Sequence, residues 1–100
     1  MQTKVNVLNG PGGQLSAEQK RRIQLFEANA YLVAEIANRY TDFGVPLMRL
    51  MERAMTGFKI SIEKYEEKYN QPFTIYASWW IKREICEEIL RCNKRKEIPI

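Results

Sequence analysis

The fold is decided by the stretch at residues 73–92, which reads FTIYASWWIKREICEEILRC. At about 100° per residue, five of its residues fall on one side of a helix: Ala77, Ile81, Ile85, Ile89 and Cys92. This is the spacing of a face that packs on a core. Thr74 can cap the helix, which should reach about residue 92, because residues 93–97 are too polar for a core and Pro99 blocks continuation.

Two further helices are predicted upstream of this stretch. Ser16 followed by Gln19 fits a capping box, and apolar residues then recur near the helical period, which predicts a long helix from about residue 17 to 40. Gly44 ends it, and Pro46 suits the first turn of a second helix that runs to about residue 68. No segment alternates like a strand. The predicted fold class is therefore all-α, a three- or four-helix bundle.

The same patterns predict the core of the bundle. Ile81, Ile85 and Ile89 should be buried against four residues of the first two helices, namely Val33, Ile36, Leu50 and Ala54. With 100 residues and 45% hydrophobic content, the chain is long enough for one core and too short for two. Residues 1–15 contain Asn9-Gly10-Pro11-Gly12-Gly13 and are predicted to be a flexible leader, which leaves residues 16–100 as the folded domain.

Composition argues against several classes of function. Histidine is absent, so His-based catalysis and mixed Cys/His zinc sites are excluded, and the two thiols of Cys86 and Cys92 make a poor metal site. Adjacent acids such as Glu66 and Glu67 diverge on a helix, so we expect no enzyme, no small-molecule substrate and no cofactor. No apolar run approaches the roughly 18 residues that span a bilayer, and no signal peptide is visible, so a cytoplasmic protein without a membrane partner is expected.

The face of the last helix opposite the isoleucines carries a second signal. Tyr76, Trp79, Arg83 and Cys86 fall there, with Trp80 and Lys82 toward the flanks. Aromatic rings beside cations suit single-stranded nucleic acid, because rings stack on unpaired bases and cations meet phosphates, and the net charge of +4 permits such a partner. General burial trends favour the alternative, in which paired tryptophans pack against a second layer.

Residues 73–82, FTIYASWWIK, look like the highly specific signature F-S-T-Y-A-T-W-W-I-R of the sigma-70 family of bacterial RNA polymerase sigma factors. Upstream, residues 25–29 and 39–41 are similar to the family's V-E-A-N and K-Y-T segments, and residues 95–100 resemble its stretch ending I-R-I-P-V. The resemblance covers residues 25–100 without a gap. It implies the fold of sigma region 2, the region that opens promoter DNA, with the last helix presenting aromatics to the melted strand.

The resemblance also implies roles for individual residues. Tyr65, Glu66 and Tyr76 match residues that form a pocket for a flipped adenine of the minus-ten element, Trp79 and Trp80 match a wedge at the duplex edge, and Lys82 matches a phosphate contact. Arg83 and Cys86 replace the Gln and Thr that often read the upstream base pair, which should change the preferred sequence. Tyr69, Gln71 and Glu87 also depart from the family pattern, and Glu87 should repel phosphate. Tyr65 could instead extend an apolar stripe, and Glu66 could be merely solvated.

The second helix departs most from the family. Residues 47–55, LMRLMERAM, align with the polymerase-docking segment F-L-D-L-I-Q-E-G-N, so Arg49 and Arg53 stand in place of two acids. In the family this face meets a basic coiled coil of core polymerase, so like charges should impair docking. The residues predicted to bind a partner are Met48, Arg49, Met51, Glu52, Arg53 and Met55. The methionines could form an adaptable contact surface, or Met51 could be core edge and the arginines solvated.

Two functions remain open from the sequence. The first is a transcription-initiation domain that binds RNA polymerase core and the single-stranded minus-ten region of promoter DNA. The second is a degenerate sigma-like interaction module that meets another protein through the second helix and binds DNA weakly. The two differ in whether the face of Trp79 or the face of Arg49 and Arg53 carries the activity.

Overall fold

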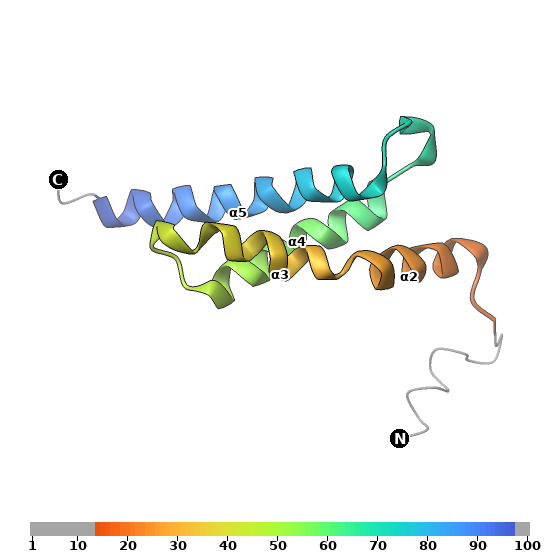
Figure 1. Ribbon diagram of the computed structural model, residues 1–100, viewed down its shortest axis with the longest axis horizontal. Coiled ribbons are helices and arrows are strands. Elements are labelled where there is room, and N and C mark those ends of the chain that lie inside the picture. Colours follow the sequence, from red (N-terminus) through yellow and green to blue (C-terminus); the bar gives the residue numbers. More distant parts are fainter. Residues whose placement is uncertain (1–13, 98–100) are drawn as a thin grey trace, which may run out of the picture.

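The computed structural model describes residues 14–97, and these residues contain helices and no strand (Figure 1). The α-helices are α2 (Ala17–Asn29), α3 (Tyr31–Ala37), α4 (Leu47–Lys64) and α5 (Phe73–Glu97), joined by the 3-10 helices η1 (Asn38–Phe43) and η2 (Glu67–Tyr69). The predicted all-α class is confirmed. The leader predicted at residues 1–15 lies, up to residue 13, outside the described residues. Within residues 14–97, no helix is both long and apolar enough to cross a lipid bilayer.

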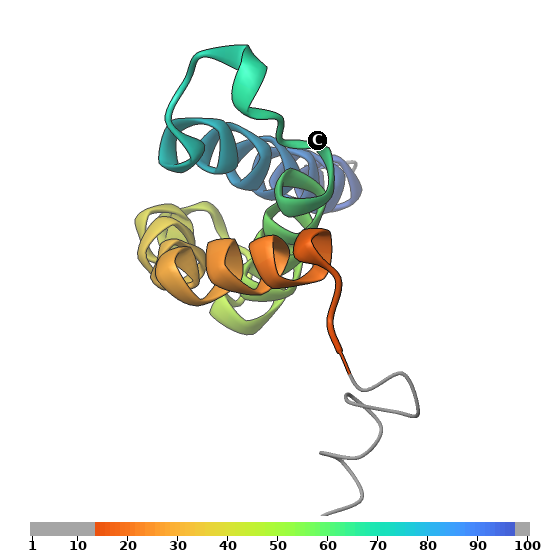
Figure 2. The same cartoon turned by 90° about the vertical axis from the view of Figure 1, so that its right-hand side faces the viewer.

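The core lies where α3, α4 and α5 meet (Figure 2). Ile81 and Ile85 of α5 are fully buried, and Ile89 nearly so. All four residues predicted to pack on them, Val33, Ile36, Leu50 and Ala54, are buried in the same cluster. The burial of these residues confirms the prediction. Its physical reason is that isoleucines four positions apart lie on one face of a helix, and this is the face that the helix buries.

The backbones of α4 and α5 come very close at Gly57. A Cβ atom placed on Gly57 would lie 2.6 Å from the carbonyl oxygen of Trp80 and 2.9 Å from the Cα atom of Ile81. Both neighbours are backbone atoms of α5, which cannot turn aside like a side chain. Gly57 therefore sets the spacing of the two helices directly beneath the paired tryptophans.

The first helix is not continuous, in contrast to the predicted helix from about residue 17 to 40. The capping box is present, with Gln19 N–H donating to Ser16 Oγ at 3.1 Å and Ser16 N–H donating to Gln19 Oε1 at 2.8 Å. The helix is interrupted at Ala30, where the side-chain amide of Asn29 donates to the Leu25 carbonyl at 2.9 Å. Such a side-chain hydrogen bond competes with the backbone hydrogen bonds of the helix for the same carbonyl oxygen. The last turns become η1, which ends at Gly44 in the left-handed conformation (φ 84°).

The other two helices also end elsewhere than predicted. Helix α4 ends at Lys64 and not near residue 68, because Tyr65 adopts an extended conformation (φ −68°, ψ 136°) that turns the chain toward η2. Helix α5 begins at Phe73, so Thr74 is inside the helix and is not its cap. It also continues to Glu97 and not to about residue 92. Its polar last turns need no core, because Lys, Arg and Glu favour helix intrinsically.

Candidate nucleic-acid interface

Helix α5 turns its core residues inward and leaves an aromatic and basic face outward. Trp79 is 57% exposed and Lys82 is exposed, whereas Tyr76 and Trp80 are half-buried. The alternative in which Trp79 packs against a second layer is therefore wrong for Trp79. Among the described side chains Lys82 takes part in no ion pair, so its ammonium group is available to an anion.

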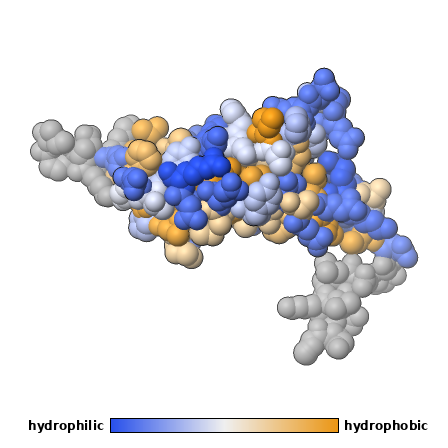
Figure 3. Space-filling view, in the orientation of Figure 1, coloured by the Kyte–Doolittle hydropathy of each residue, from blue (hydrophilic) through white to orange (hydrophobic). Residues whose placement is uncertain are grey.

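Two hollows lie beside Trp79 on this face. One, of about 410 Å³, is lined by Thr74, Ile75, Ser78, Trp79 and Lys82. The other, of about 370 Å³, is lined by Gln71, Ile75, Tyr76 and Trp79. An apolar spot surrounded by more hydrophilic surface is visible over the first turns of α5 (Figure 3). Each volume falls within the range of small-ligand pockets, roughly 300–1,000 Å³, so each hollow can accept one flat ring.

Ile75, Thr74 and Ser78 line these hollows and were not among the predicted site residues. Ile75 is exposed, which is unusual for isoleucine and marks it as part of a surface. Helical spacing could have found Ile75, because it lies four positions before Trp79 and shares its face. Thr74 and Ser78 do not have this spacing, and only the structure places them beside Trp79.

An aromatic cluster supports the start of this face. The ring of Tyr65 packs on Phe73 with centroids 5.1 Å apart and on Tyr76 at 5.4 Å, and Tyr69 packs on Tyr76 at 5.6 Å. Tyr65 is buried, and its hydroxyl donates to the Gln71 carbonyl at 2.6 Å. Buried Tyr65 therefore packs beneath the surface aromatic residues, and its hydrogen bond holds the chain that follows η2. Tyr69 and Tyr76 keep part of their rings exposed to solvent.

Glu66 and Arg83 are held by neighbouring charges. Glu66 is exposed and lies 3.2 Å from the ammonium nitrogen of Lys68. Arg83 lies over the Trp80 ring at 5.5 Å and forms ion pairs with Glu84 at 3.3 Å and with Glu87 at 3.4 Å. Its guanidinium is therefore already engaged and would have to leave two carboxylates to read a base.

Cys86 and Trp80 differ from the rest of the predicted set. Cys86 is exposed, but it lines a separate hollow with Tyr40, Phe43, Ile89 and Leu90, away from Trp79. Burial, and then the neighbouring Cys86, raise the pKa of Tyr40. The indole N–H of Trp80 is buried and has no acceptor among the described residues, so Trp80 is held by ring packing, including an edge contact with Trp79 at 5.1 Å.

The arginines of α4 point to α5. Arg53 donates to Glu84 at 2.8 Å, to Glu88 at 2.9 Å and to Glu87 at 3.3 Å, and Arg49 donates to Glu88 at 3.2 Å. Glu88 is 1% exposed. Neither arginine is merely solvated, as one alternative held. We call these residues, together with Arg83 and Arg91, the α4–α5 ion network.

The electrostatics of the network follow from its geometry. Arg91 donates to both oxygens of Glu88, at 2.8 and 2.7 Å. Hydrogen bonding by Arg91 is the main reason that the pKa of Glu88 falls from 4.5 to about 2; burial acts in the opposite direction, and Arg49 and Cys92 add to the fall. Four arginines meet three glutamates, so the network carries an excess of only one positive charge.

The methionines predicted to bind a partner do not form one exposed row. Met48 is 69% exposed, whereas Met51 and Met55 are half-buried and pack against the core. Glu52 is exposed. The part of α4 that can meet a partner is therefore its first turns, around Met48 and the outer edge of Arg49, with Glu52 beside them.

Comparison of the sequence with known proteins identifies a relative of this chain. No protein-family model matches the chain. The chain is similar to the RNA polymerase sigma factor RpoS of Coxiella burnetii (strain RSA 493 / Nine Mile phase I), with 34% identity over 83 residues. The matched region covers 83% of this chain and 24% of the relative, so the chain spans about a quarter of the relative's length. The chain is therefore a homologue, over most of its own length, of the sigma-70 family of bacterial RNA polymerase sigma factors.

Proposed function

We propose that the domain acts in transcription initiation by binding the non-template single strand of the promoter minus-ten element. The name of its relative, an RNA polymerase sigma factor, supports the general role. The observation that carries the specific proposal is the exposed ring of Trp79, with a hollow on each side and with Lys82 beside it, which forms no ion pair with any side chain that the structure describes. Unpaired bases stack on such rings while the backbone phosphate meets the cation.

Each residue of the face has a separate task in this proposal. Trp79 and Tyr76 stack on bases, with Tyr69 extending the aromatic surface, and Lys82 contacts phosphate. Exposed Glu66 accepts hydrogen bonds from the edge of an extruded base. Glu87 weakens binding by repelling phosphate and by holding Arg83 at 3.4 Å. Trp80 lies at the end of the site where the duplex begins. Tyr65 packs beneath Tyr76 and holds its ring in position.

Binding of labelled oligonucleotides tests the proposal. We expect tighter binding to single-stranded minus-ten sequence than to duplex of equal length, and Trp79→Ala should cost about 1 to 3 kcal/mol, the usual value of one stacked base. Tyr31→Ala is the matched control, because Tyr31 is an equally exposed aromatic residue on α3 (58% against 57% for Trp79). Equal losses for the two variants, or no binding by wild type at low salt, would favour the interaction-module alternative.

We also propose that the first turns of α4 contact RNA polymerase core. The α4–α5 ion network leaves this face nearly neutral, so the repulsion expected from Arg49 and Arg53 alone is largely cancelled. Exposed Met48 then supplies apolar contact, and Glu52 supplies the remaining acid. A neutral face should bind purified core with little salt dependence, and Glu52→Lys should weaken binding. Affinity that rises steeply with salt would show that repulsion dominates and would contradict the proposal.

A further inference from the structure

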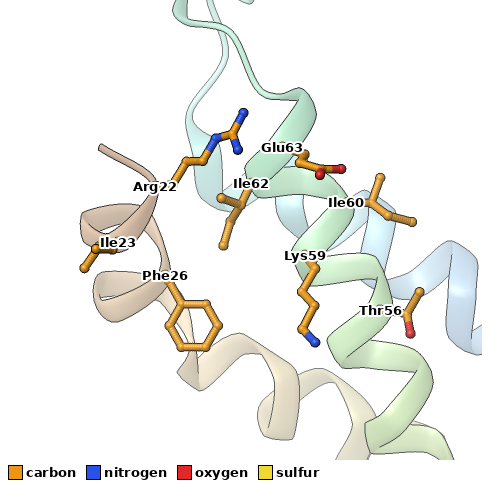
Figure 4. Close-up of a pocket in the computed structure, with 8 residues that line it drawn as sticks. All are labelled: Arg22, Ile23, Phe26, Thr56, Lys59, Ile60, Ile62 and Glu63. Carbon is orange, nitrogen blue, oxygen red and sulfur yellow. The ribbon is translucent and has the colours of Figure 1, made fainter. Parts of the chain in front are cut away.

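A second surface lies toward the C-terminal end of α4, further along the helix than Arg49 and Arg53 of the ion network. A groove of about 520 Å³ runs between α2 and α4. Its walls are Arg22, Ile23 and Phe26 of α2 and Thr56, Lys59, Ile60, Ile62 and Glu63 of α4 (Figure 4). No residue of α5 lines it, so the groove is separate from the proposed DNA face and from the ion network.

Helix α2 is poorly covered by the rest of the domain. None of its 13 residues is buried, and Ile23 and Phe26 are 41% and 38% exposed. Its main anchors are the ring of Phe26 on Phe58, with centroids 5.3 Å apart, and a hydrogen bond from Arg21 to the Tyr65 carbonyl at 3.3 Å. Isolated helices shorter than about 12–15 residues are marginal in water. An occupant of the groove would bury the apolar side of α2 and stabilise it.

The charges around the groove indicate what kind of occupant fits. As Figure 4 shows, Arg22 lies near Ile62 at one end of the groove, and Lys59 lies across from Phe26 at the other. The guanidinium group of Arg22 forms an ion pair with Glu18 at 2.9 Å. Lys59 forms no ion pair with any described side chain. Glu63 extends from the far side of α4. An apolar floor with a cation at each end is complementary to an apolar segment flanked by carboxylates.

The geometry of the walls further specifies the occupant. On α4, Lys59 and Ile62 extend toward α2, whereas Thr56, Ile60 and Glu63 extend from the other side of the helix (Figure 4). Two neighbouring helices with a groove between them form the kind of surface that a third, amphipathic helix fills. We propose that the α2–α4 groove binds an acidic amphipathic helix of a partner protein, with apolar residues on Phe26 and Ile62 and carboxylates on Arg22 and Lys59. The partner can bind while the α5 face is occupied by DNA.

Designed peptides test this proposal. The probe is a labelled helical peptide of about 16 residues, roughly four turns, with leucines spaced i, i+3, i+4, i+7 and glutamates on both sides. A second peptide has lysines in place of the glutamates. The acidic peptide should bind at least about tenfold more tightly, a difference of roughly 1.4 kcal/mol, and should shift the amide signals of residues 22–26 and 56–63. Equal affinity of the two peptides, or shifts confined to α5, would overturn the proposal.

Variants of one helix provide the matched control. Lys59→Glu should remove the preference for the acidic peptide, whereas Lys64→Glu, which changes the same charge on α4 outside the groove, should leave the preference in place. Ile23→Ser should weaken both peptides, because it removes an apolar wall that already faces solvent. Denaturant unfolding of each variant shows that the domain remains folded. If Lys59→Glu and Lys64→Glu behave alike, the attraction is general and the groove is not the site.

Discussion

Reversing the charges of Arg49 and Arg53 should destabilise the domain and should not restore family-like docking. The sequence predicts that Arg49 and Arg53 impair docking through like-charge repulsion, which Arg49→Asp with Arg53→Glu would relieve. The structure places both guanidinium groups on carboxylates of α5, with Glu88 1% exposed. The double reversal would therefore place two new acids against Glu84 and Glu88, which have little access to water.

The size of the effect can be worked from Glu88. The fall of its pKa from 4.5 to about 2 corresponds to about 3 to 4 kcal/mol in favour of the ionised carboxylate, at roughly 1.4 kcal/mol per pKa unit. Arg91 is the main cause of this fall and Arg49 contributes a smaller part, so the larger cost of the reversal is the loss of buried ion-pair partners. Removing one partner of a buried ion pair costs about 3–5 kcal/mol in other proteins. We therefore expect the double reversal to lower the free energy of unfolding by at least about 3 kcal/mol, a large share of the roughly 5–15 kcal/mol typical of a domain.

Urea unfolding at pH 7, followed by tryptophan fluorescence and circular dichroism, measures this loss. The control is Arg22→Glu with Arg39→Glu, which changes the net charge equally but breaks exposed pairs with Glu18 and Glu35. Such surface pairs contribute about 0–1 kcal/mol each. Adding Glu84→Ala and Glu88→Ala to the double reversal should recover much of the loss. If the double reversal is no more destabilising than the control, the ion network does not hold α4 on α5.

Three further predictions concern the same helix pair. Gly57→Ala should destabilise the domain by about 1–3 kcal/mol in thermal unfolding, because the new methyl group would meet the Trp80 carbonyl at 2.6 Å and outweigh the gain of about 1 kcal/mol in helix propensity; a stabilised variant would contradict the close approach. The contribution of Glu88, whose folded pKa is depressed to about 2, should be complete above its usual pKa of 4.5 and lost as the pH falls toward 2. Glu88→Gln should flatten that part of the stability profile relative to wild type, and identical profiles would refute the assignment. Glu87→Gln should strengthen binding to single-stranded DNA several-fold at low salt, since it removes a charge that repels phosphate and releases Arg83; unchanged or weaker binding in a titration would count against the proposed DNA face.

Much of the candidate site was predictable from helix periodicity. Isoleucines every four residues in α5 required Ile81 and Ile85 to face inward, and this placed Trp79 outward with Lys82 beside it. The exposed face of a single helix depends on spacing within one segment, so it can be worked out before the fold is known. The same reasoning could not predict that Cys86 lies in a separate hollow with Tyr40, because Tyr40 comes from another part of the chain.

The ends of the helices depended on contacts that periodicity does not contain. The spacing of apolar residues continues through Tyr65, yet α4 stops before it, with the Tyr65 hydroxyl bonded to the Gln71 carbonyl and its ring packed on Phe73. The interruption at Ala30 accompanies a bond from the Asn29 side chain to the backbone. Local propensity is a weak preference that such contacts override.

The sequence by itself determined the all-helical class, the capping box at Ser16, the buried isoleucines and the outward tryptophan, because each follows from residues within a few positions of one another. Only the tertiary structure decided the role of Arg49 and Arg53. Their partners, Glu84 and Glu88, lie more than 30 positions along the chain, and the pairs form only when α4 lies in one register on α5. That register depends on the close approach at Gly57 and on core packing. The sequence of α4 alone predicts that Arg49 and Arg53 are exposed docking residues, but glutamates of α5 neutralise their charges. An ion pair depends on the distance between two groups in space and not on their separation in sequence.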